Sequence, residues 1–230
     1  MESLDLLANN LANSGTAGFK RDQEFYGLFT SSDASGADDN AAATMPVIQR
    51  QWTDFSPGTL QVTGNPLDVA LNGTGFFAVN GANGPLYTRN GSLQVLASGD
   101  LATADGYPLR STTGGTIQVT SGKPIEISTD GTVRQNGQSL GQIQLVTFKS
   151  TDSLVKVGST CFQNSDPKNP PVNASPEVQQ GKLEGSNVPV AEAAMRLVGV
   201  MRQFEMLQKA LGVSSDMDSK TIQEVARVGS

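Results

Sequence analysis

The sequence predicts a mainly β fold: a central antiparallel β domain, either a sandwich or an irregular barrel, flanked by N- and C-terminal α-helices that form a coiled-coil-like domain. Three observations lead to this prediction. Turn dipeptides typical of hairpins recur through the middle of the chain, apolar residues there alternate with a period of two, and both ends carry apolar residues at helical spacing.

The first helix is expected near the N-terminus, where Leu4, Leu7 and Leu11 are spaced three and four residues apart. Gly15 and Gly18 then end the helical pattern. A stripe of about three turns is too short to persist as an isolated helix in water. We therefore expect this helix to pack on another element.

The β domain is expected from turn signals between residues 59 and 148. In segment 67–71, Leu67, Val69 and Leu71 should face a core while Asp68 faces solvent. No helical segment separates the turns, which favours antiparallel pairing over βαβ units. The same alternation recurs in Ile117/Val119, Ile125/Ile127 and Ile143/Leu145, and the turn dipeptides are Asn72-Gly73, Asn90-Gly91, Asp105-Gly106, Gly114-Gly115, Asp130-Gly131 and Asn136-Gly137.

The C-terminal helix carries a second apolar stripe in a heptad pattern. After the sequence Gly-Val-Ser-Ser at 212–215 the register is restored by Ile222 and Val225. We expect either one helix with a flexible joint or two helices, the second capped by Ser214 or Ser215. The stripe consists of Ala194, Leu197, Met201, Phe204, Gln208 and Leu211.

Composition along the chain predicts five segments. Residues 30–44 are small, polar and acidic, as in a flexible linker, and prolines after residue 165 favour an extended connector. The expected segments are an N-terminal helix and motif segment at 1–30, a linker at 31–58, the β domain at 59–165, a connector at 166–188 and the C-terminal helix at 189–230, paired with the N-terminal helix.

Charge and residue usage exclude several functions. The net charge is −6 and no stretch is dense in Lys or Arg, so the sequence lacks the basic patch that binding to nucleic acid requires. The chain has no histidine, which removes the usual general base and the commonest metal ligand, so we expect no enzyme and no cofactor. We interpret the single Cys161 as a small apolar residue that packs in the core.

The N-terminus lacks the basic segment and the long apolar segment of a leader sequence, so we expect no cleaved signal peptide. No apolar run is long enough for membrane insertion.

Three stretches make a family resemblance specific. The first is ANNLAN at 8–13 followed by GFKR at 18–21, the second comprises DFSPGTL at 54–60, TGNPLDVAL at 63–71 and GFF at 75–77, and the third comprises QGKLEGSNV at 180–188 and MRQFEM at 201–206. Together these stretches resemble the bacterial flagellar rod and hook axial proteins. Within that family, the GNPLDVAL motif and the final EVARV motif at 224–228 resemble those of proximal-rod subunits more than those of distal-rod or hook proteins.

The resemblance implies a structural subunit of the basal-body rod, exported through the flagellar export apparatus and assembled by packing of terminal helices. Its implied partners are other rod and hook axial proteins and further copies of itself. The expected helix interface consists of Leu4, Leu7, Asn10, Leu11, Leu197, Met201, Phe204, Leu211, Ile222 and Val225, and the expected motif residues are Asn9, Asn13, Gly18, Phe19, Asn65 and Pro66.

Three departures or alternatives accompany this interpretation. Asn9, Asn10 and Asn13 either fix the register between helices, as polar seam residues do, or are solvated near a frayed helix end. The family pattern has two or three more helical turns before the first motif, whereas only residues 1–7 precede it here. Gly212 inside the last helix is a second departure.

Two other functions compete with the rod interpretation. A carboxylate enzyme such as a glycoside hydrolase could use Asp68, Asp105, Glu126 and Asp130, although these acids sit at turns or outward strand positions. A secreted or surface module that binds glycan or peptide could use a stacking platform of aromatic residues, although aromatics around a sheet are more often core. The platform would consist of Trp52, Phe55, Phe76, Phe77 and Tyr87.

Overall fold

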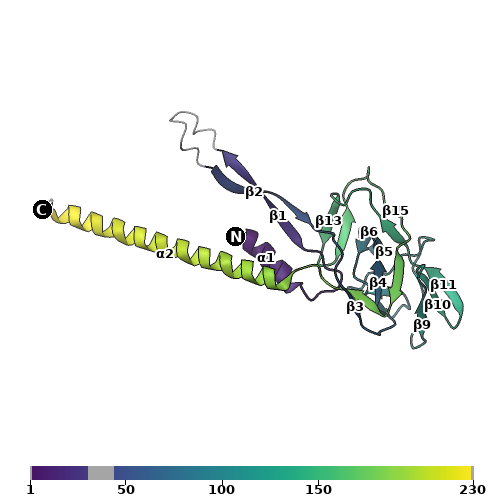
Figure 1. The fold of residues 1–230 in the computed structure, drawn as a ribbon. Helices are drawn as coiled ribbons and strands as arrows, with labels where there is room; N and C mark the ends of the chain where they lie inside the picture. Colours follow the sequence, from purple (N-terminus) through teal and green to yellow (C-terminus); the bar gives the residue numbers. More distant parts are fainter. Residues whose placement is uncertain (1, 31–43, 229–230) are drawn as a thin grey trace. The chain divides into compact units, whose positions relative to one another are not determined.

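A computed structural model of the chain describes residues 2–30 and 44–228 (Figure 1). It divides into two compact units, one made of residues 1–11 and 189–230 and the other of residues 12–188. The described residues are mainly β and form several antiparallel sheets, as predicted.

The second unit is built from one large sheet and several small ones. The large sheet has six strands in the order β13 (Leu154–Val157), β14 (Cys161–Asn164), β6 (Gly84–Thr88), β5 (Phe76–Gly81), β12 (Leu145–Thr147) and β15 (Val172–Asn173). A three-stranded sheet has the order β11 (Gln138–Gln142), β10 (Thr132–Gln135) and β9 (Ile125–Ile127). The remaining pairs are β1 (Asp22–Thr30) with β2 (Thr44–Thr53), β16 (Glu177–Gln180) with β4 (Val69–Asn72), β17 (Lys182–Glu184) with β3 (Leu60–Val62), and β7 (Leu93–Val95) with β8 (Leu101–Thr103).

The large sheet has a hydrophobic cluster on each face. On β5, Phe77 and Val79 belong to one cluster, whereas Phe76 and Ala78 belong to the other. Successive residues of a strand point to opposite faces, so β5 is buried on both sides. This double burial explains why the first four residues of β5, 76–79, form an uninterrupted apolar run instead of an alternating one.

The turn between β10 and β11 has the conformation that its Asn-Gly dipeptide predicts. Between β10 and β11, Asn136 and Gly137 connect the paired residues Gln135 and Gln138, and both have positive φ, 53° and 75°. That is the geometry of the two-residue type I′ hairpin that an Asn-Gly dipeptide favours. The predicted inward pairs Ile117/Val119, Ile125/Ile127 and Ile143/Leu145 are all buried.

Asp68 corrects one prediction. We expected it to face solvent, but its side chain is only 6% exposed. The Asn65 amide donates a hydrogen bond to its Oδ1 at 3.1 Å, which supplies a partner for the buried carboxylate. Strict alternation therefore fails beside this turn, because a local polar partner makes burial of the acid tolerable.

Strand pairing extends beyond the segment expected to form the β domain. Residues 166–188, expected as a connector, contain β15, β16 and β17, which pair with β12, β4 and β3. Upstream, β1 and β2 form an antiparallel hairpin with a register shift between Phe25 and Tyr26. Of the linker expected at 31–58, residues 44–53 form β2, and residues 31–43 lie outside the described residues.

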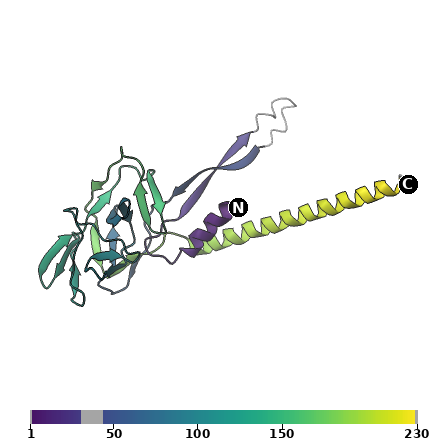
Figure 2. The same ribbon diagram turned by 180° about the vertical axis from the view of Figure 1, so that it is seen from behind.

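The first unit contains two helices that lie side by side in both views (Figures 1 and 2). They are α1 (Glu2–Ala12) and α2 (Val190–Val228). α2 runs through residues 212–215 without interruption, so the two-helix alternative is wrong. Among the described residues, no helix combines the length and apolar character needed to cross a membrane.

We predict that Gly91→Ala destabilises the β domain. A Cβ at residue 91 would lie 1.7 Å from the carbonyl oxygen of Val69, whereas a Cβ at Gly115 would meet no atom within 4 Å. We expect a loss of at least about 2 kcal/mol in the free energy of unfolding, measured by urea denaturation, because backbone must move to admit the methyl group. Gly115→Ala is the matched control and should change stability by no more than about 0.5 kcal/mol; equal effects of both substitutions would contradict the close approach.

Candidate functional site

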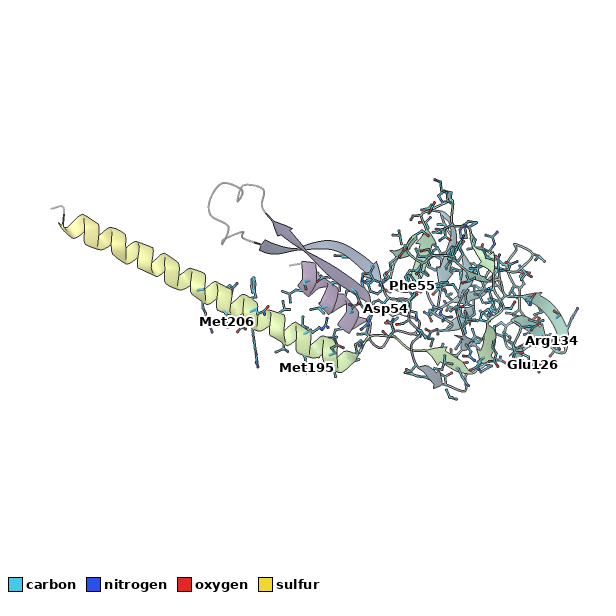
Figure 3. The ribbon with its side chains drawn as sticks, turned by 45° about the horizontal axis from the view of Figure 1, so that its top comes forward. Asp54, Phe55, Glu126, Arg134, Met195 and Met206 are labelled. Atoms are coloured by element: carbon cyan, nitrogen blue, oxygen red, sulfur yellow. The ribbon has the colours of Figure 1, made fainter. Side chains whose placement is uncertain are left out.

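Parts of all three stretches that carry the family resemblance meet in the second unit. Residues 18–22, 54–58 and 184–187 are joined by hydrogen bonds and ion pairs, together with Arg89, which directly follows β6. We call this set of residues the terminal clamp, because it lies where the chain enters and leaves the β domain. Figure 3 labels two of its members, Asp54 and Phe55.

A buried ion pair forms the centre of the terminal clamp. Lys20 Nζ lies 2.5 Å from Glu184 Oε1, and Arg89 Nε lies 3.2 Å from Glu184 Oε2. The three side chains are 0%, 1% and 5% exposed for Lys20, Glu184 and Arg89. Lys20 Nζ also donates to the Ser56 carbonyl at 2.8 Å, and the Gly58 N–H donates to Glu184 Oε1 at 3.0 Å. One carboxylate thus links three distant segments of the chain.

Burial sets the electrostatics of this cluster. It lowers the pKa of Lys20, an effect that the charge and hydrogen bond of Glu184 oppose. The pKa of Arg89 is also lowered by burial and supported by Glu184. Because two cations share one anion, removing Glu184 would leave both without a charged partner in a desolvated site.

Two glycines allow the segments of the terminal clamp to approach closely. Gly18 has a φ of +68°, and a Cβ there would lie 2.3 Å from the Asn90 backbone nitrogen. A Cβ at Gly58 would lie 1.9 Å from the Gly185 carbonyl oxygen. The Gly18 N–H donates to the Glu184 carbonyl at 2.7 Å, so the entering segment pairs directly with the end of β17. Side chains at these positions would separate the segments.

A second layer of hydrogen bonds surrounds the ion pair. The Arg21 N–H donates to Asn187 Oδ1 at 2.8 Å, and Asn187 Nδ2 donates to the Asp54 carbonyl at 2.8 Å. The Arg21 guanidinium binds Asp54 Oδ2 through Nε at 3.0 Å and Nη2 at 2.9 Å. Burial raises the pKa of the Asp54 carboxyl, but hydrogen bonds from Ser56 and the contact with Arg21 outweigh that effect and hold it below its usual value.

Apolar and cationic contacts fix the terminal clamp to the large sheet. Phe55 packs edge-on against Phe76 and Phe162, with ring centroids 5.6 and 4.9 Å apart. Lys156 of β13 places its ammonium 4.3 Å from the centroid of the fully buried Phe19 ring. Its Nζ also donates to the Lys20 carbonyl at 2.8 Å and to Asp22 Oδ2 at 2.6 Å.

The structure places the predicted motif residues in different surroundings. Gly18 and Phe19 belong to the terminal clamp and are buried. Asn65 and Pro66 form the exposed turn before β4, where Asn65 Oδ1 accepts from the Leu67 N–H at 3.2 Å. Asn9 of α1 is exposed, and Asn13 is half-buried and accepts from the Thr16 hydroxyl at 3.3 Å.

The predicted interface residues all lie on α1 or α2, and their role in assembly stays a prediction. Leu4, Leu7, Leu11 and Leu197 are half-buried, and Asn10 is buried. Met201 and Phe204 are 52% and 43% exposed. The side chains of Leu211, Ile222 and Val225 lie outside the described part of the structure.

Sequence reasoning missed the ionic centre of the terminal clamp. Lys20 and Glu184 lie within the motif stretches, but the sequence alone does not mark either as a functional residue. Neither lies in a periodic pattern, and no spacing rule connects charges that are 164 residues apart. The available signal was a lone charge inside each of two glycine-containing motifs, LEG and GFK, with opposite signs.

The features proposed for a glycan-binding module do not form a platform. Phe76, Phe77 and Tyr87 are buried, and Phe55 packs against the core, which leaves Trp52 alone substantially exposed at 45%. Flat exposed aromatic surfaces are what stacking on a ligand requires. These five side chains therefore serve mainly as core.

The candidate acids of an enzyme are used as local hydrogen-bond acceptors. Asp105 Oδ2 accepts from the Thr160 hydroxyl at 2.9 Å, and Asp130 accepts from the Thr132 hydroxyl, which lowers the Asp130 pKa. Among the described residues there is no group of three or more His, Cys, Asp or Glu placed to hold a metal. Cys161 is buried, and burial together with the charge of Asp105 raises the pKa of its thiol to about 11.

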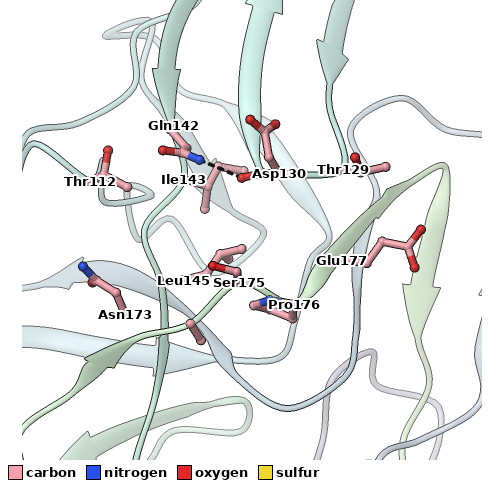
Figure 4. A pocket seen from close by; sticks show the side chains of 11 residues that line it. Thr112, Thr129, Asp130, Gln142, Ile143, Leu145, Asn173, Ser175, Pro176 and Glu177 are labelled. Atoms are coloured by element: carbon pink, nitrogen blue, oxygen red, sulfur yellow. Dashed lines mark hydrogen bonds between the residues drawn. The ribbon is translucent and has the colours of Figure 1, made fainter.

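One pocket of about 510 Å³ lies beside Asp130 (Figure 4). Its lining mixes polar and apolar residues, and within it Gln142 Nε2 donates to the Asp130 carbonyl at 2.9 Å. The second acid, Glu177, is engaged by the Asn72 amide at 2.9 Å. The pocket thus combines backbone turns and hydrogen-bonded side chains without the convergent acid pair of a glycosidase.

These features define a β-domain protein in which a buried ionic cluster anchors the segments that lead to its terminal helices. Two family models match the chain: the flagellar hook protein FlgE/F/G D1 domain over residues 70–135 and the flagellar basal body rod FlgEFG protein C-terminal region over residues 179–224.

Full-length comparison identifies the family. A flagellar basal-body rod protein FlgF from Mesorhizobium japonicum is 31% identical over 95% of this chain and 91% of its own length. FlgF from Caulobacter vibrioides is 27% identical over 98% of this chain and 92% of its own, and FlgG from Bacillus subtilis is 29% identical over 93% and 90%. The chain belongs to the flagellar basal-body rod protein family and is similar to its FlgF members, as the motifs predicted.

We predict that Glu184→Gln strongly destabilises the second unit. The substitution leaves Lys20 and Arg89 buried without an anion, which should lower the free energy of unfolding by about 3–5 kcal/mol, as measured by urea denaturation. Lys20→Met should cost less, because Arg89 still faces the carboxylate. The control is Glu192→Gln, which breaks the exposed 2.8 Å pair with Arg196 and should change stability by no more than about 0.5 kcal/mol. Equal effects of the Glu184 and Glu192 substitutions would contradict a stabilising clamp.

We predict that Asp54 contributes to stability in a pH-dependent manner. Its pKa in the folded state is lowered, so the contribution is fully present above the unfolded-state value of about 4 and is lost as the pH falls through the lower folded-state pKa. The difference in unfolding free energy between wild type and Asp54→Asn should therefore be largest near pH 7 and shrink below about pH 4. Urea titrations at pH 7, 4 and 3 measure this difference, and a constant value across them would refute the assignment.

Proposed function

We propose that this protein is a structural, non-catalytic subunit of the flagellar basal-body rod that assembles by packing of its terminal helices. The observation that carries the proposal is the exposure of apolar residues on α2, where Met201 and Phe204 are 52% and 43% exposed. Family membership supports the same role, because the relatives are named flagellar basal-body rod proteins.

The lengths of the two helices support an intermolecular role for α2. At 1.5 Å per residue, the 11 residues of α1 span about 16 Å and the 39 residues of α2 span about 58 Å. α1 can therefore shield only the first part of the apolar stripe on α2. Burying the remainder in a coiled-coil-like contact with helices of neighbouring subunits removes apolar surface from water, a favourable change that one chain cannot make alone.

The terminal clamp supports this function by securing the chain ends. It holds residues 18–22 and 184–187 against the β domain through paired charges and backbone hydrogen bonds. Helices that begin beyond such an anchored base can carry assembly contacts without unfolding the β domain. The partners that fit this arrangement are further copies and other rod and hook axial proteins, reached after passage through the flagellar export apparatus to the basal body.

The proposal predicts that serine at both Met201 and Phe204 weakens self-association. Each large apolar side chain buried at an interface contributes about 1.5–3 kcal/mol, so the dissociation constant should rise by at least about tenfold, as measured by sedimentation velocity over a concentration series. The β signal in circular dichroism should stay unchanged, because these residues lie outside the second unit.

The matched control replaces the exposed polar residues Arg196 and Gln203 with serine, which should leave association unchanged. Self-association that survives the loss of Met201 and Phe204, with the control behaving identically, would contradict assembly through the α2 stripe.

A further inference from the structure

Strand β3 has an edge that none of the described strands covers. β3 pairs with β17 in a two-stranded sheet and lies at the lower border of the β domain in Figure 1. The Gly185 N–H donates to the Thr59 carbonyl at 2.8 Å, and the Thr63 N–H donates to the Gly181 carbonyl at 2.9 Å. Residues 59 and 63 therefore direct their backbone polar groups toward β17.

Leu60 and Val62 form the opposite, open edge of β3. In an antiparallel pair, the residues that bond to one neighbouring strand alternate with residues whose N–H and C=O groups point the other way. Leu60 and Val62 are 39% and 79% exposed, and all residues at 59–63 are exposed. An open edge that also presents apolar side chains is a site to which another strand can add.

The open edge of β3 lacks the features that usually prevent strand addition. Natural edge strands are protected by charged residues, by prolines or by β-bulges. Segment 59–63 contains no charged residue and no proline, and its pairing with β17 has no register shift. The two outer strands of the six-stranded sheet differ, because β13 carries Lys156 and Pro171 directly precedes β15. Protection is therefore missing at β3 in particular.

The order of residues along this edge selects its occupant. Segment 59–63 has the same pattern in either direction: threonine, apolar, glutamine, apolar, threonine. Antiparallel pairing of two such segments about Gln61 places Thr59 opposite Thr63 of the second copy, and Leu60 opposite Val62 of the second copy. Opposed aliphatic pairs and opposed threonine pairs stabilise a sheet, and no like charges meet. A second copy of this chain therefore matches the edge at every position.

We propose that the open edge of β3 pairs with the same edge of a second copy, with a two-fold axis at Gln61. The backbone groups of Leu60 and Val62 bond to those of Val62 and Leu60 of the second copy, and Gln61 faces its own counterpart at a non-hydrogen-bonded position. The contact is isologous, because both chains use the same patch. It goes beyond the proposed function, since it lies in the β domain and uses no residue of α2.

The contact is short and should be weak. Stable protein interfaces bury about 1,200–2,000 Å², more than the edges of two short strands can supply. We therefore expect a pair that forms at high protein concentration and dissociates on dilution. Experiments that trap the pair, or that follow it over a concentration series, can detect it.

Disulfide trapping tests the register of the contact. Full-length Gln61→Cys, oxidised with glutathione disulfide, should form at least fivefold more covalent dimer than Thr63→Cys, because position 61 faces itself across the axis. Two copies of position 63 would lie four strand positions apart, about 13 Å, which is too far for a disulfide. Thr59→Cys mixed with Thr63→Cys should cross-link, and the buried Cys161 stays unreactive. Equal dimer yields from Gln61→Cys and Thr63→Cys would overturn the proposed register.

A charge on the edge tests the contact without cross-linking. In the full-length chain with serine at Met201 and Phe204, Val62→Lys should raise the dissociation constant for self-association at least fivefold in sedimentation velocity. A lysine on an edge strand opposes strand addition, and Val62 is exposed enough to accept it without disturbing the fold. The matched control is Val155→Lys on β13, where the valine is 54% exposed, and it should alter association less than twofold.

The outcomes separate this inference from the proposed function. If the Met201/Phe204 serine variant is monomeric at all concentrations while wild type associates, pairing through β3 is overturned and assembly through the α2 stripe still holds. If wild type and the serine variant associate equally and Val62→Lys dissociates both, pairing through β3 holds and assembly through the α2 stripe is overturned.

Discussion

The ion pair between Lys20 and Glu184 is the interaction on which the arrangement of the chain ends depends. Both groups are almost completely removed from water, and Arg89 adds a second cation to the same carboxylate. Buried charges of this kind are tolerated only when geometry and hydrogen bonding are nearly complete. The backbone groups of Ser56 and Gly58 add hydrogen bonds to Lys20 Nζ and Glu184 Oε1, and they draw the segment at 54–58 into the same site. A single carboxylate thereby determines where three distant segments meet.

Much of the β domain could be predicted from local chemistry. The Asn136-Gly137 dipeptide forms the expected hairpin turn, and the alternating isoleucines at 125 and 127 are buried as their period required. Such features depend on neighbours within a few residues, where dihedral preferences and side-chain period act directly. The helical pattern of the last forty residues was equally clear, although Gly212 and the adjacent serines obscured that α2 continues without interruption.

The rest depended on contacts that no local pattern encodes. Strands β16 and β17 lie in a proline-containing segment that reads as a connector, and they are strands because β4 and β3 present open edges to them. Asp68 is buried because Asn65 offers it a donor, which overrides alternation. The terminal clamp is the clearest case, since its charges are meaningful only once the fold has brought them together. Family motifs pointed to the correct stretches but not to the residues that hold them.

The distance along the chain between Lys20 and Glu184 of the terminal clamp also determines an order of events during synthesis. The lysine is translated early, and its carboxylate partner follows 164 residues later. At about 5–20 residues per second, ribosomes need on the order of 10–30 s to cover that distance. Throughout this interval the Lys20 ammonium lacks the carboxylate with which it is paired in the folded protein, so it stays hydrated. The nascent N-terminal segment therefore waits outside the β domain until nearly the whole polypeptide has been made.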